Sequence, residues 1–132
     1  MKDPNNPCLF CNTKKNEFKF ENDLAYVTFD SYPVSDKHCL IIPKRHIEKY
    51  FDLSEKEIIE CNKLIVKMKN YIENNDKLVK GFNIGINSGK VAGQSVWHCH
   101  IHLIPRREND VENPQGGVRG VIPAKQHYAR KS

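Results

Sequence analysis

The sequence predicts an α+β fold in which an antiparallel sheet of about five strands packs against one long helix. Three observations lead to this fold class. Short apolar segments typical of strands occur before and after a single helical segment. That helical segment opens with a capping sequence and carries one apolar stripe. The 132 residues suit one domain that buries its own core.

The strands are predicted from apolar alternation and from their turn residues. Residues 17–29 carry apolar side chains on both sides of a Glu-Asn-Asp turn, which predicts a hairpin, and residues 38–42 form a short apolar strand. Residues 82–87 alternate Phe, Ile and Ile with Asn, Gly and Asn, as in a strand with one buried face. A last strand is expected over residues 96–104, ended by Pro105.

The helix is the clearest single element. Ser54 and Glu57 have the spacing of a capping box, in which the two side chains satisfy backbone N–H groups at the first turn. The Asn-Asn-Asp sequence at residues 74–76 is expected to end the helix. Its apolar stripe, with alternating spacings of three and four, consists of Ile58, Cys61, Ile65, Met68 and Ile72.

Composition and charge exclude several classes of protein. The net charge of +5 is modest and lacks the dense basic stripe of a nucleic-acid-binding protein. No apolar run approaches the roughly 18 residues that span a bilayer, so no membrane partner is expected. The first residues, Met-Lys-Asp-Pro-Asn-Asn-Pro, lack the apolar core of a signal peptide, which predicts a cytoplasmic protein.

Three histidines at a spacing of two form the strongest functional signal. On a strand, His98, His100 and His102 would share one face about 7 Å apart, while Cys99 and Ile101 would face the core. Aligned imidazoles make a poor core because both nitrogens of each ring need hydrogen-bond partners. We therefore predict a catalytic or metal-binding site on this strand.

Two chemistries fit such a row of histidines. All three imidazoles could bind a catalytic metal, or one could act as a nucleophile while its neighbours bind phosphate oxygens. The preceding loop, residues 89–95, favours the second chemistry. It offers backbone N–H groups between glycines, together with Gln and Ser side chains, and such groups bind phosphate without a metal.

Several motifs together resemble the histidine triad (HIT) family over residues 8–106. In one-letter code they are DSYP at 30–33, HCLIIPKRH at 38–46, GINSG at 85–89, GQSV at 93–96 and HCHIHLIPR at 98–106. The resemblance implies an antiparallel sheet with one helix, usually continued across a homodimer. It also implies a nucleotide hydrolase or nucleotidyl transferase that acts on substituted nucleoside monophosphates.

The resemblance further implies roles for individual residues. His100 matches the nucleophile that attacks the α-phosphorus, His102 a group that contacts a phosphate oxygen, and His38 a histidine that orients the triad. Together these three are the implied catalytic set. The implied nucleotide-binding positions are Asp30, Asn87, Gln94, Ser95 and His102. Simpler explanations exist for two of them, since Asp30 could cap a turn and Asn87 could satisfy a strand end.

The five cysteines divide into two groups. Cys39, Cys61 and Cys99 lie among apolar residues and are expected in the core. Cys8 and Cys11 form a Cys-x-x-Cys pair, which by itself is a metal knuckle, a redox pair or an accident of sequence. The HIT resemblance implies the first of these, a structural zinc ion held by Cys8, Cys11, His46 and His98.

The chain is expected to have two regions. A HIT domain over residues 1–106 includes the N-terminal zinc knuckle, and an irregular extension over residues 107–132 packs on or near the active site. Within the extension, Arg119 could meet a phosphate group or lie in solvent.

The leading functional hypothesis is a homodimeric hydrolase that acts on an adenine nucleotide. It would cleave the α-phosphate linkage of dinucleoside polyphosphates such as diadenosine tetraphosphate, through a covalent nucleotidyl-histidine. One alternative is an adenosine 5'-phosphoramidase. The other is a non-catalytic nucleotide-binding protein that acts through interaction with a partner.

Overall fold

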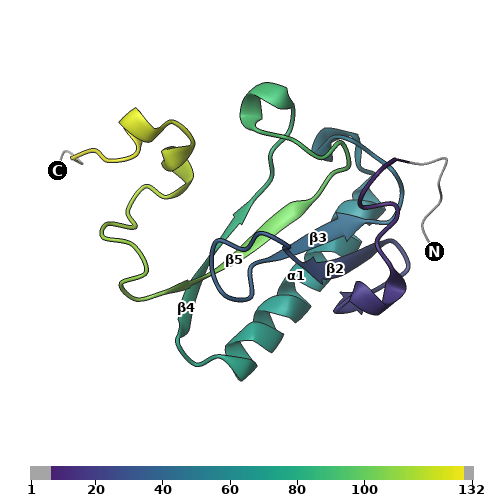
Figure 1. Ribbon diagram of the computed structural model, residues 1–132, viewed down its shortest axis with the longest axis horizontal. Coiled ribbons are helices and arrows are strands. Elements are labelled where there is room, and N and C mark those ends of the chain that lie inside the picture. The colour runs from purple at the N-terminus through teal and green to yellow at the C-terminus, as the bar shows by residue number, and fades with distance from the viewer. Residues whose placement is uncertain (1–6, 130–132) are drawn as a thin grey trace.

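The computed structural model describes residues 7–129. Its centre is a five-stranded sheet, and one long helix, α1 (Glu55–Asn75), crosses one face of that sheet (Figure 1). The sheet order is β1-β2-β3-β5-β4, and each neighbouring pair is antiparallel. This arrangement confirms the predicted fold class. The strand bounds are β1 (Phe20–Glu21), β2 (Ala25–Phe29), β3 (Cys39–Pro43), β4 (Val79–Gly85) and β5 (Ile101–Arg107).

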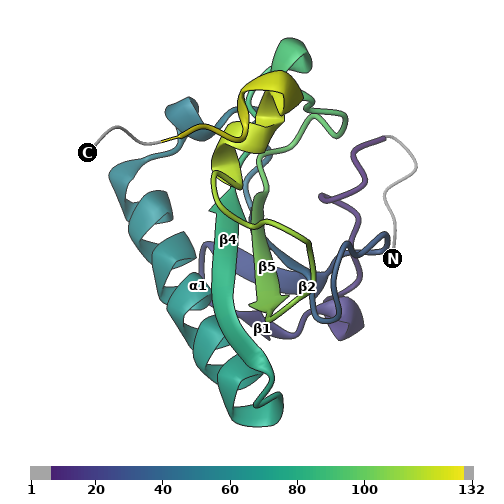
Figure 2. The same ribbon diagram turned by 90° about the vertical axis from the view of Figure 1, so that its left-hand side faces the viewer.

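Each face of the sheet has its own apolar cluster. The larger cluster lies between the sheet and α1, whose position against the strands is visible in Figure 2. Its members include two cysteines, Cys39 and Cys61, and the aliphatic residue Ile101. On the opposite face, a smaller cluster gathers around Phe10 from the N-terminal segment. That second face also carries His102, which is paired with Leu40 of β3 in the sheet register.

The first turn of α1 confirms the capping box. Ser54 Oγ accepts a hydrogen bond from the Glu57 N–H at 3.1 Å, and Glu57 Oε1 accepts one from the Ser54 N–H at 2.9 Å. The predicted stripe is partly wrong, because Ile58 is 37% exposed and Ile65 is only partly buried. Glu57 points inward instead, since Arg45 neutralises its carboxylate. The buried face of the helix consists of Glu57, Cys61, Leu64, Met68 and Ile72.

The Glu57 carboxylate is expected to make the stability of the protein depend on acid pH. The Arg45 hydrogen bonds, at 2.7 and 3.1 Å, are the main cause that lowers the pKa of Glu57 from 4.5 to about 2. That difference corresponds to about 3 kcal/mol of stability, present above pH 4.5 and lost as the pH falls from 4.5 towards 2.

Denaturant unfolding of Glu57→Gln across this pH range checks the expectation. At pH 7 the variant should be less stable than the parent, and the gap should shrink steadily below pH 4.5. Glu55→Gln, an exposed change in the same helical turn, is the control and should leave stability nearly unchanged. A gap for Glu57→Gln that stays constant down to pH 3 would contradict the role given to the ion pair.

The segment that carries the first two triad histidines is not part of the sheet. β5 begins at Ile101, whereas the sequence predicts a strand from residue 96, so His98 and His100 precede the strand. The cause is a contact outside the sheet, since the Cys99 N–H donates to the Ile47 carbonyl oxygen at 2.6 Å. The segment before β5 therefore pairs with the loop after β3, and this places that loop beside the triad.

The other end of β5 also differs from expectation. β5 continues through Pro105 to Arg107, because β3 pairs with β5 only as far as Leu103 and the missing N–H of the proline can face the unpaired side. Beyond Arg107, up to residue 129, the chain forms two short 3-10 segments, Val118–Val121 and Pro123–Lys125, drawn in yellow in Figure 1. None of the described helices has the length and apolar character needed to cross a membrane.

Candidate active site and metal centre

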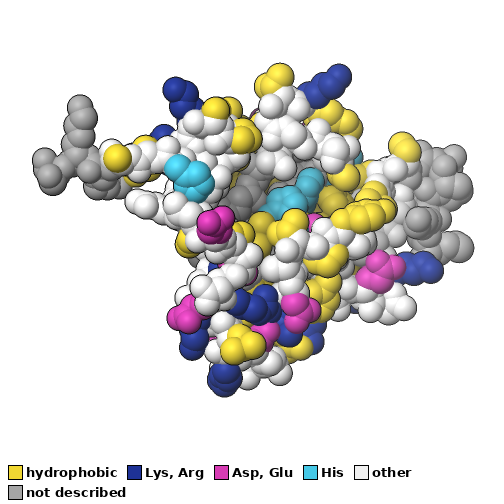
Figure 3. Space-filling model, turned by 60° about the vertical axis from the view of Figure 1, so that its left-hand side comes forward, with side chains coloured by type: hydrophobic (Ala, Val, Ile, Leu, Met, Phe, Trp, Pro, Cys, Tyr) yellow, Lys and Arg dark blue, Asp and Glu magenta, His cyan; other side chains and the backbone are white. Residues whose placement is uncertain are grey.

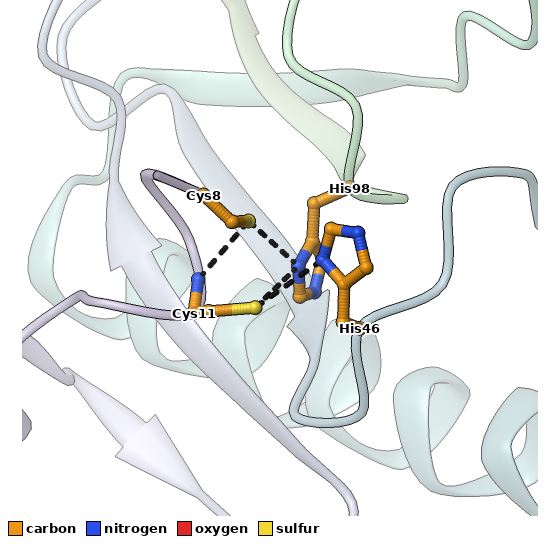
Figure 4. A group of neighbouring side chains, drawn as sticks. All are labelled: Cys8, Cys11, His46 and His98. Atoms are coloured by element: carbon orange, nitrogen blue, oxygen red, sulfur yellow. Dashed lines mark hydrogen bonds between the residues drawn. The ribbon is translucent and has the colours of Figure 1, made fainter. Parts of the chain in front are cut away.

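Two cysteines and two histidines that are distant in sequence lie together beside the sheet. Cys8 and Cys11 come from the N-terminal loop, His46 from the loop after β3, and His98 from the segment before β5 (Figure 4). Cys8 Sγ lies 3.3 Å from His98 Nδ1, and Cys11 Sγ lies 3.3 Å from His46 Nδ1 and 3.5 Å from His98 Nδ1.

These separations fit a metal ion. One ligand atom from each of the four side chains lies within 4.8 Å of the others. A tetrahedral zinc ion with its usual bond lengths separates sulfur and nitrogen ligands by about 3.6 Å, close to the distances found here. The four residues named by the sequence therefore form a cluster that could bind a metal.

The backbone sets the orientation of His98. Its Nε2 lies 2.7 Å from the Pro43 carbonyl oxygen, which can only accept, so we assign the ring proton to Nε2 and the lone pair to Nδ1. Burial lowers the pKa of His98, against the raising effect of the Pro43 hydrogen bond. His98 is therefore a neutral ring with its lone pair directed at the two cysteines, which is the form that binds a metal.

His100 carries the opposite tautomer. Its Nδ1 lies 2.8 Å from the His98 carbonyl oxygen, so Nδ1 donates its proton there and Nε2 keeps the lone pair. The ring is buried, with 8% of the residue exposed, and the edge of the Phe10 ring contacts it at 5.0 Å between ring centroids. An imidazole with a free Nε2 lone pair is the form required of a nucleophile.

A chain of hydrogen bonds fixes the tautomer of His102. The Val34 N–H donates to His38 Nδ1 at 3.0 Å, so His38 carries its proton on Nε2. That nitrogen lies 2.9 Å from His102 Nδ1, which must therefore accept. His102 in turn keeps its own proton on Nε2, where the N–H can donate to a ligand.

Asp30 lies at the end of this chain. Its Oδ2 is 3.4 Å from His38 Nε2, while its Oδ1 accepts a hydrogen bond from the Tyr32 N–H at 2.8 Å. Asp30 thus caps a turn, as the simpler explanation proposes, and also contacts His38. Burial lowers the pKa of His38 against the opposing effect of Asp30, and burial together with the neighbouring His100 and His38 lowers the pKa of His102.

Asp30, His38 and His102 also have ligand atoms within 4.8 Å of one another, as a metal site would. The Val34 hydrogen bond argues against a metal there, because it leaves the proton on the His38 nitrogen that would have to ligate. A backbone hydrogen bond therefore gives the two clusters different properties. The Pro43 carbonyl leaves the His98 lone pair directed at the cysteine cluster, whereas the Val34 N–H makes Asp30, His38 and His102 a hydrogen-bond chain.

The loop before the triad is shaped by Gln94. Its buried side chain accepts from the Gly89 N–H at 2.9 Å and donates to the carbonyl oxygens of Glu48 at 2.7 Å and Val96 at 3.2 Å. The amide predicted to bind phosphate is thus engaged within the protein. Gly89 and Gly93 have φ values of 95°, which side-chain-bearing residues rarely adopt. The loop conformation consequently depends on both glycines and on Gln94.

A pocket of about 890 Å³ lies between the face of the sheet that carries His102 and the C-terminal extension. Figure 3 shows histidine side chains at a hollow in the surface, with apolar side chains around it. Asn87 is at the pocket, whereas Ser95 is exposed on the loop and does not line it. The polar residues that line it come from both the domain and the extension and include His38, Asn83, Asn87, His102, Gln126 and His127, together with the charged Arg106, Asp110 and Glu112.

Arg119 is engaged within the extension. Its guanidinium donates to the carbonyl oxygens of Lys125 at 2.8 Å and Gln126 at 3.4 Å and lies over the Tyr128 ring at 4.5 Å. It does not line the pocket. Arg119 is exposed to solvent, and these contacts give it a part in folding the extension. Its contact with a phosphate group stays a prediction.

Two contributors to the site were not predicted from sequence. Phe10 contacts the His100 ring, and the Val34 N–H orients His38. Phe10 lies between Cys8 and Cys11, so its place in the predicted knuckle was an available signal. The Val34 contact is made by the backbone N–H, which every residue except proline has, so the residue type at this position does not indicate it.

Comparison with known proteins places the chain in a family. The family model of the HIT domain matches residues 12–109. The chain belongs to the HIT family. A HIT-like protein of Methanocaldococcus jannaschii is 36% identical over 110 residues, covering 80% of this chain and 83% of the relative. An adenosine 5'-monophosphoramidase of Candida albicans is 35% identical over 108 residues, covering 76% and 71%.

Solved HIT structures agree with the fold. A HIT family protein from Bacillus anthracis matches with a TM-score of 0.73 at 33% identity, covering 80% of this chain and 77% of that chain. A zinc-bound HIT protein from Mycobacterium smegmatis gives 0.71 at 25% identity, covering 89% and 92%. A diadenosine triphosphate hydrolase from Plasmodium falciparum, solved with cyclomarin A, gives 0.66 at 32% identity, covering 86% and 76%.

Proposed function

We propose that this HIT protein hydrolyses the α-phosphate linkage of substituted nucleoside 5'-monophosphates, with dinucleoside polyphosphates as the first substrate class. One observation carries the proposal. The His100 Nε2 lone pair and the His102 Nε2–H belong to neighbouring rings, 5.2 Å apart between centroids, and backbone contacts set both tautomers. A nucleophile and a hydrogen-bond donor for phosphate are thereby prepared side by side.

In the proposed reaction, His100 Nε2 attacks the α-phosphorus in line with the departing group. A nitrogen–phosphorus bond forms while the bond to the leaving group breaks, and the leaving group takes the electron pair. Water then attacks the same phosphorus, breaks the nitrogen–phosphorus bond, releases the nucleoside monophosphate and restores neutral His100. The His102 N–H stabilises the charge on a phosphate oxygen during both displacements.

The residues around the nucleophile hold it in place. The His100 Nδ1–H donates to the His98 carbonyl oxygen, and in this tautomer of the neutral ring the lone pair is on Nε2. Asp30, which contacts the His38 ring, is proposed to accept hydrogen bonds from the ribose hydroxyls, and Asn87 and Ser95 to contact the phosphate or leaving group. Gln94 supports them by shaping their loop.

We further propose that Cys8, Cys11, His46 and His98 hold a structural zinc ion. Their donor set of two sulfurs and two nitrogens suits zinc, and a zinc-bound HIT structure is among the proteins similar to this chain. When bound, the ion would fasten the N-terminal loop to the segment before β5 without contacting substrate. Because such a site needs reduced cysteines, the proposal includes a reducing compartment, the cytoplasm.

The proposal includes a homodimer. β4 lies at one edge of the sheet, where within residues 7–129 it pairs with β5 alone, and Ile84 on this strand is 53% exposed. Pairing of β4 with its counterpart in a second copy would cover this edge and continue the sheet across a two-fold axis.

A phosphoramidase is the second candidate, favoured by the 35% identity to the Candida albicans adenosine 5'-monophosphoramidase. Incubation of the purified protein with diadenosine tetraphosphate and with AMP-lysine separates the two. Faster release of AMP and ATP from the first substrate is the expected result. Faster release of AMP from AMP-lysine would establish the phosphoramidase, and absence of product from both would favour a non-catalytic nucleotide-binding protein.

A further inference from the structure

Phe10, the second of the two residues between Cys8 and Cys11, lies against the nucleophile candidate. Phe10 is 9% exposed, and its ring meets the His100 ring edge-on, with 5.0 Å between centroids and an angle of 65°. It also meets the His98 ring at 6.0 Å and 87°. One aromatic side chain thus contacts both a metal-ligand candidate and the nucleophile candidate.

Phe10 is held from several sides. Cys8 and Cys11 flank it in the chain, and both point into the metal cluster. Its carbonyl oxygen accepts a hydrogen bond from the Tyr26 hydroxyl at 2.6 Å. Burial raises the pKa of Tyr26 to about 12, so this hydroxyl keeps its proton and the bond persists at neutral pH. The position of the Phe10 ring is therefore determined by the knuckle and by β2 together.

We propose that Phe10 is a positioning residue that couples the metal cluster to the His100 imidazole; this rests on the proposed function. The Nδ1–H bond to the His98 carbonyl restrains one edge of the His100 ring, and the Phe10 ring blocks rotation away from it. With both contacts, Nε2 keeps its lone pair and its direction. Two contacts connect the Cys8, Cys11, His46 and His98 cluster to His100. One is the hydrogen bond from His100 to the His98 carbonyl, and the other is the packing of the Phe10 ring on the His100 ring.

Phe10→Leu tests the proposal, because leucine keeps an apolar side chain in the smaller cluster but loses the ring edge against His100. The matched control is Phe18→Leu. Phe18 packs on the same cluster and stacks on Tyr26 at 4.1 Å, and among the described residues it makes no ring contact with a triad histidine. Each variant is compared with the parent protein in kcat, KM, zinc content and the imidazole nitrogen signals of His100.

We expect Phe10→Leu to lower kcat about tenfold or more, while KM stays within about twofold and zinc content is unchanged. Phe18→Leu should leave kcat within about twofold. In long-range proton–nitrogen NMR spectra of the neutral His100 ring, the parent should show the Nδ1–H tautomer alone, and Phe10→Leu should show both tautomers.

Three results would overturn the proposal. These are a kcat for Phe10→Leu within twofold of the parent, an equal loss in Phe18→Leu, or loss of zinc from Phe10→Leu, which would make Phe10 part of the metal site's own structure. The NMR result does not depend on turnover. If the parent protein hydrolyses no nucleotide, the proposed function fails, and an unchanged His100 tautomer in Phe10→Leu separately refutes the positioning role.

Discussion

His100→Ala is expected to lower kcat by about 10⁴-fold or more on any substrate that the protein hydrolyses, because the variant lacks the atom that forms the covalent intermediate. The His100 ring does not belong to the metal cluster, and it lies beside the ring of His102, so zinc content and the far-ultraviolet spectrum should match those of the parent. Steady-state and single-turnover kinetics measure the loss.

His102→Ala provides the comparison for this variant. It removes a donor to a phosphate oxygen but leaves the nucleophile, so a smaller loss of about 10²- to 10³-fold is expected. Equal losses in the two variants would mean that the two rings do not have the separate roles assigned from their tautomers. Retention of a tenth or more of the parent kcat in His100→Ala would remove His100 as the nucleophile.

Removing the metal ligands is expected to have the largest effect on stability. In Cys8→Ser/Cys11→Ser the free energy of unfolding should fall by about 3 kcal/mol or more and Tm by about 10 °C, because the N-terminal loop loses its attachment to His46 and His98. Differential scanning calorimetry measures the change. A chelator should produce a similar shift in the parent protein and none in the double variant, which serves as the control.

The time course of chelation distinguishes a structural metal from a catalytic one. A structural zinc ion predicts slow loss of activity that accompanies loosening of the fold. A metal held by the three triad histidines predicts immediate loss with the fold intact. The orientations of the three rings already favour the first, since only His98 points at the cysteines, while His100 and His102 use other partners.

Much of the fold could be predicted from local sequence patterns. The capping box of Ser54 and Glu57, the hairpin and the buried strand each depend on short-range preferences, and all three are present. The strand, predicted over residues 38–42, runs from Cys39 to Pro43. The helix stripe was predicted less well. In the first turn of the helix, the side chain that faces the core is Glu57. Its buried carboxylate is stabilised by the ion pair with Arg45, and apolar periodicity along the helix does not indicate this partner.

The residues of the candidate site could be named from sequence, but their states could not. The spacing of the triad predicts a shared face on a strand, yet His98 and His100 lie before β5. Which nitrogen of each ring holds the proton depends on backbone groups. The Pro43 carbonyl, 55 residues from His98, comes from the end of β3, whereas the His98 carbonyl and the Val34 N–H lie two and four residues from the rings they contact. Residue type fixes neither the chain path nor the local backbone conformation that places these groups, and they distinguish a ligand, a nucleophile and a donor among identical side chains.

The most direct test of this account is to trap and map the covalent intermediate. A single turnover with diadenosine tetraphosphate and with AMP-lysine, quenched in alkali and digested with protease, would be examined by mass spectrometry for a peptide carrying AMP. We predict one adduct, on His100, absent from His100→Ala. An adduct on His98 or His102, or hydrolysis that proceeds in the single-turnover regime with no adduct at all, would contradict the assignment of His100 as the nucleophile.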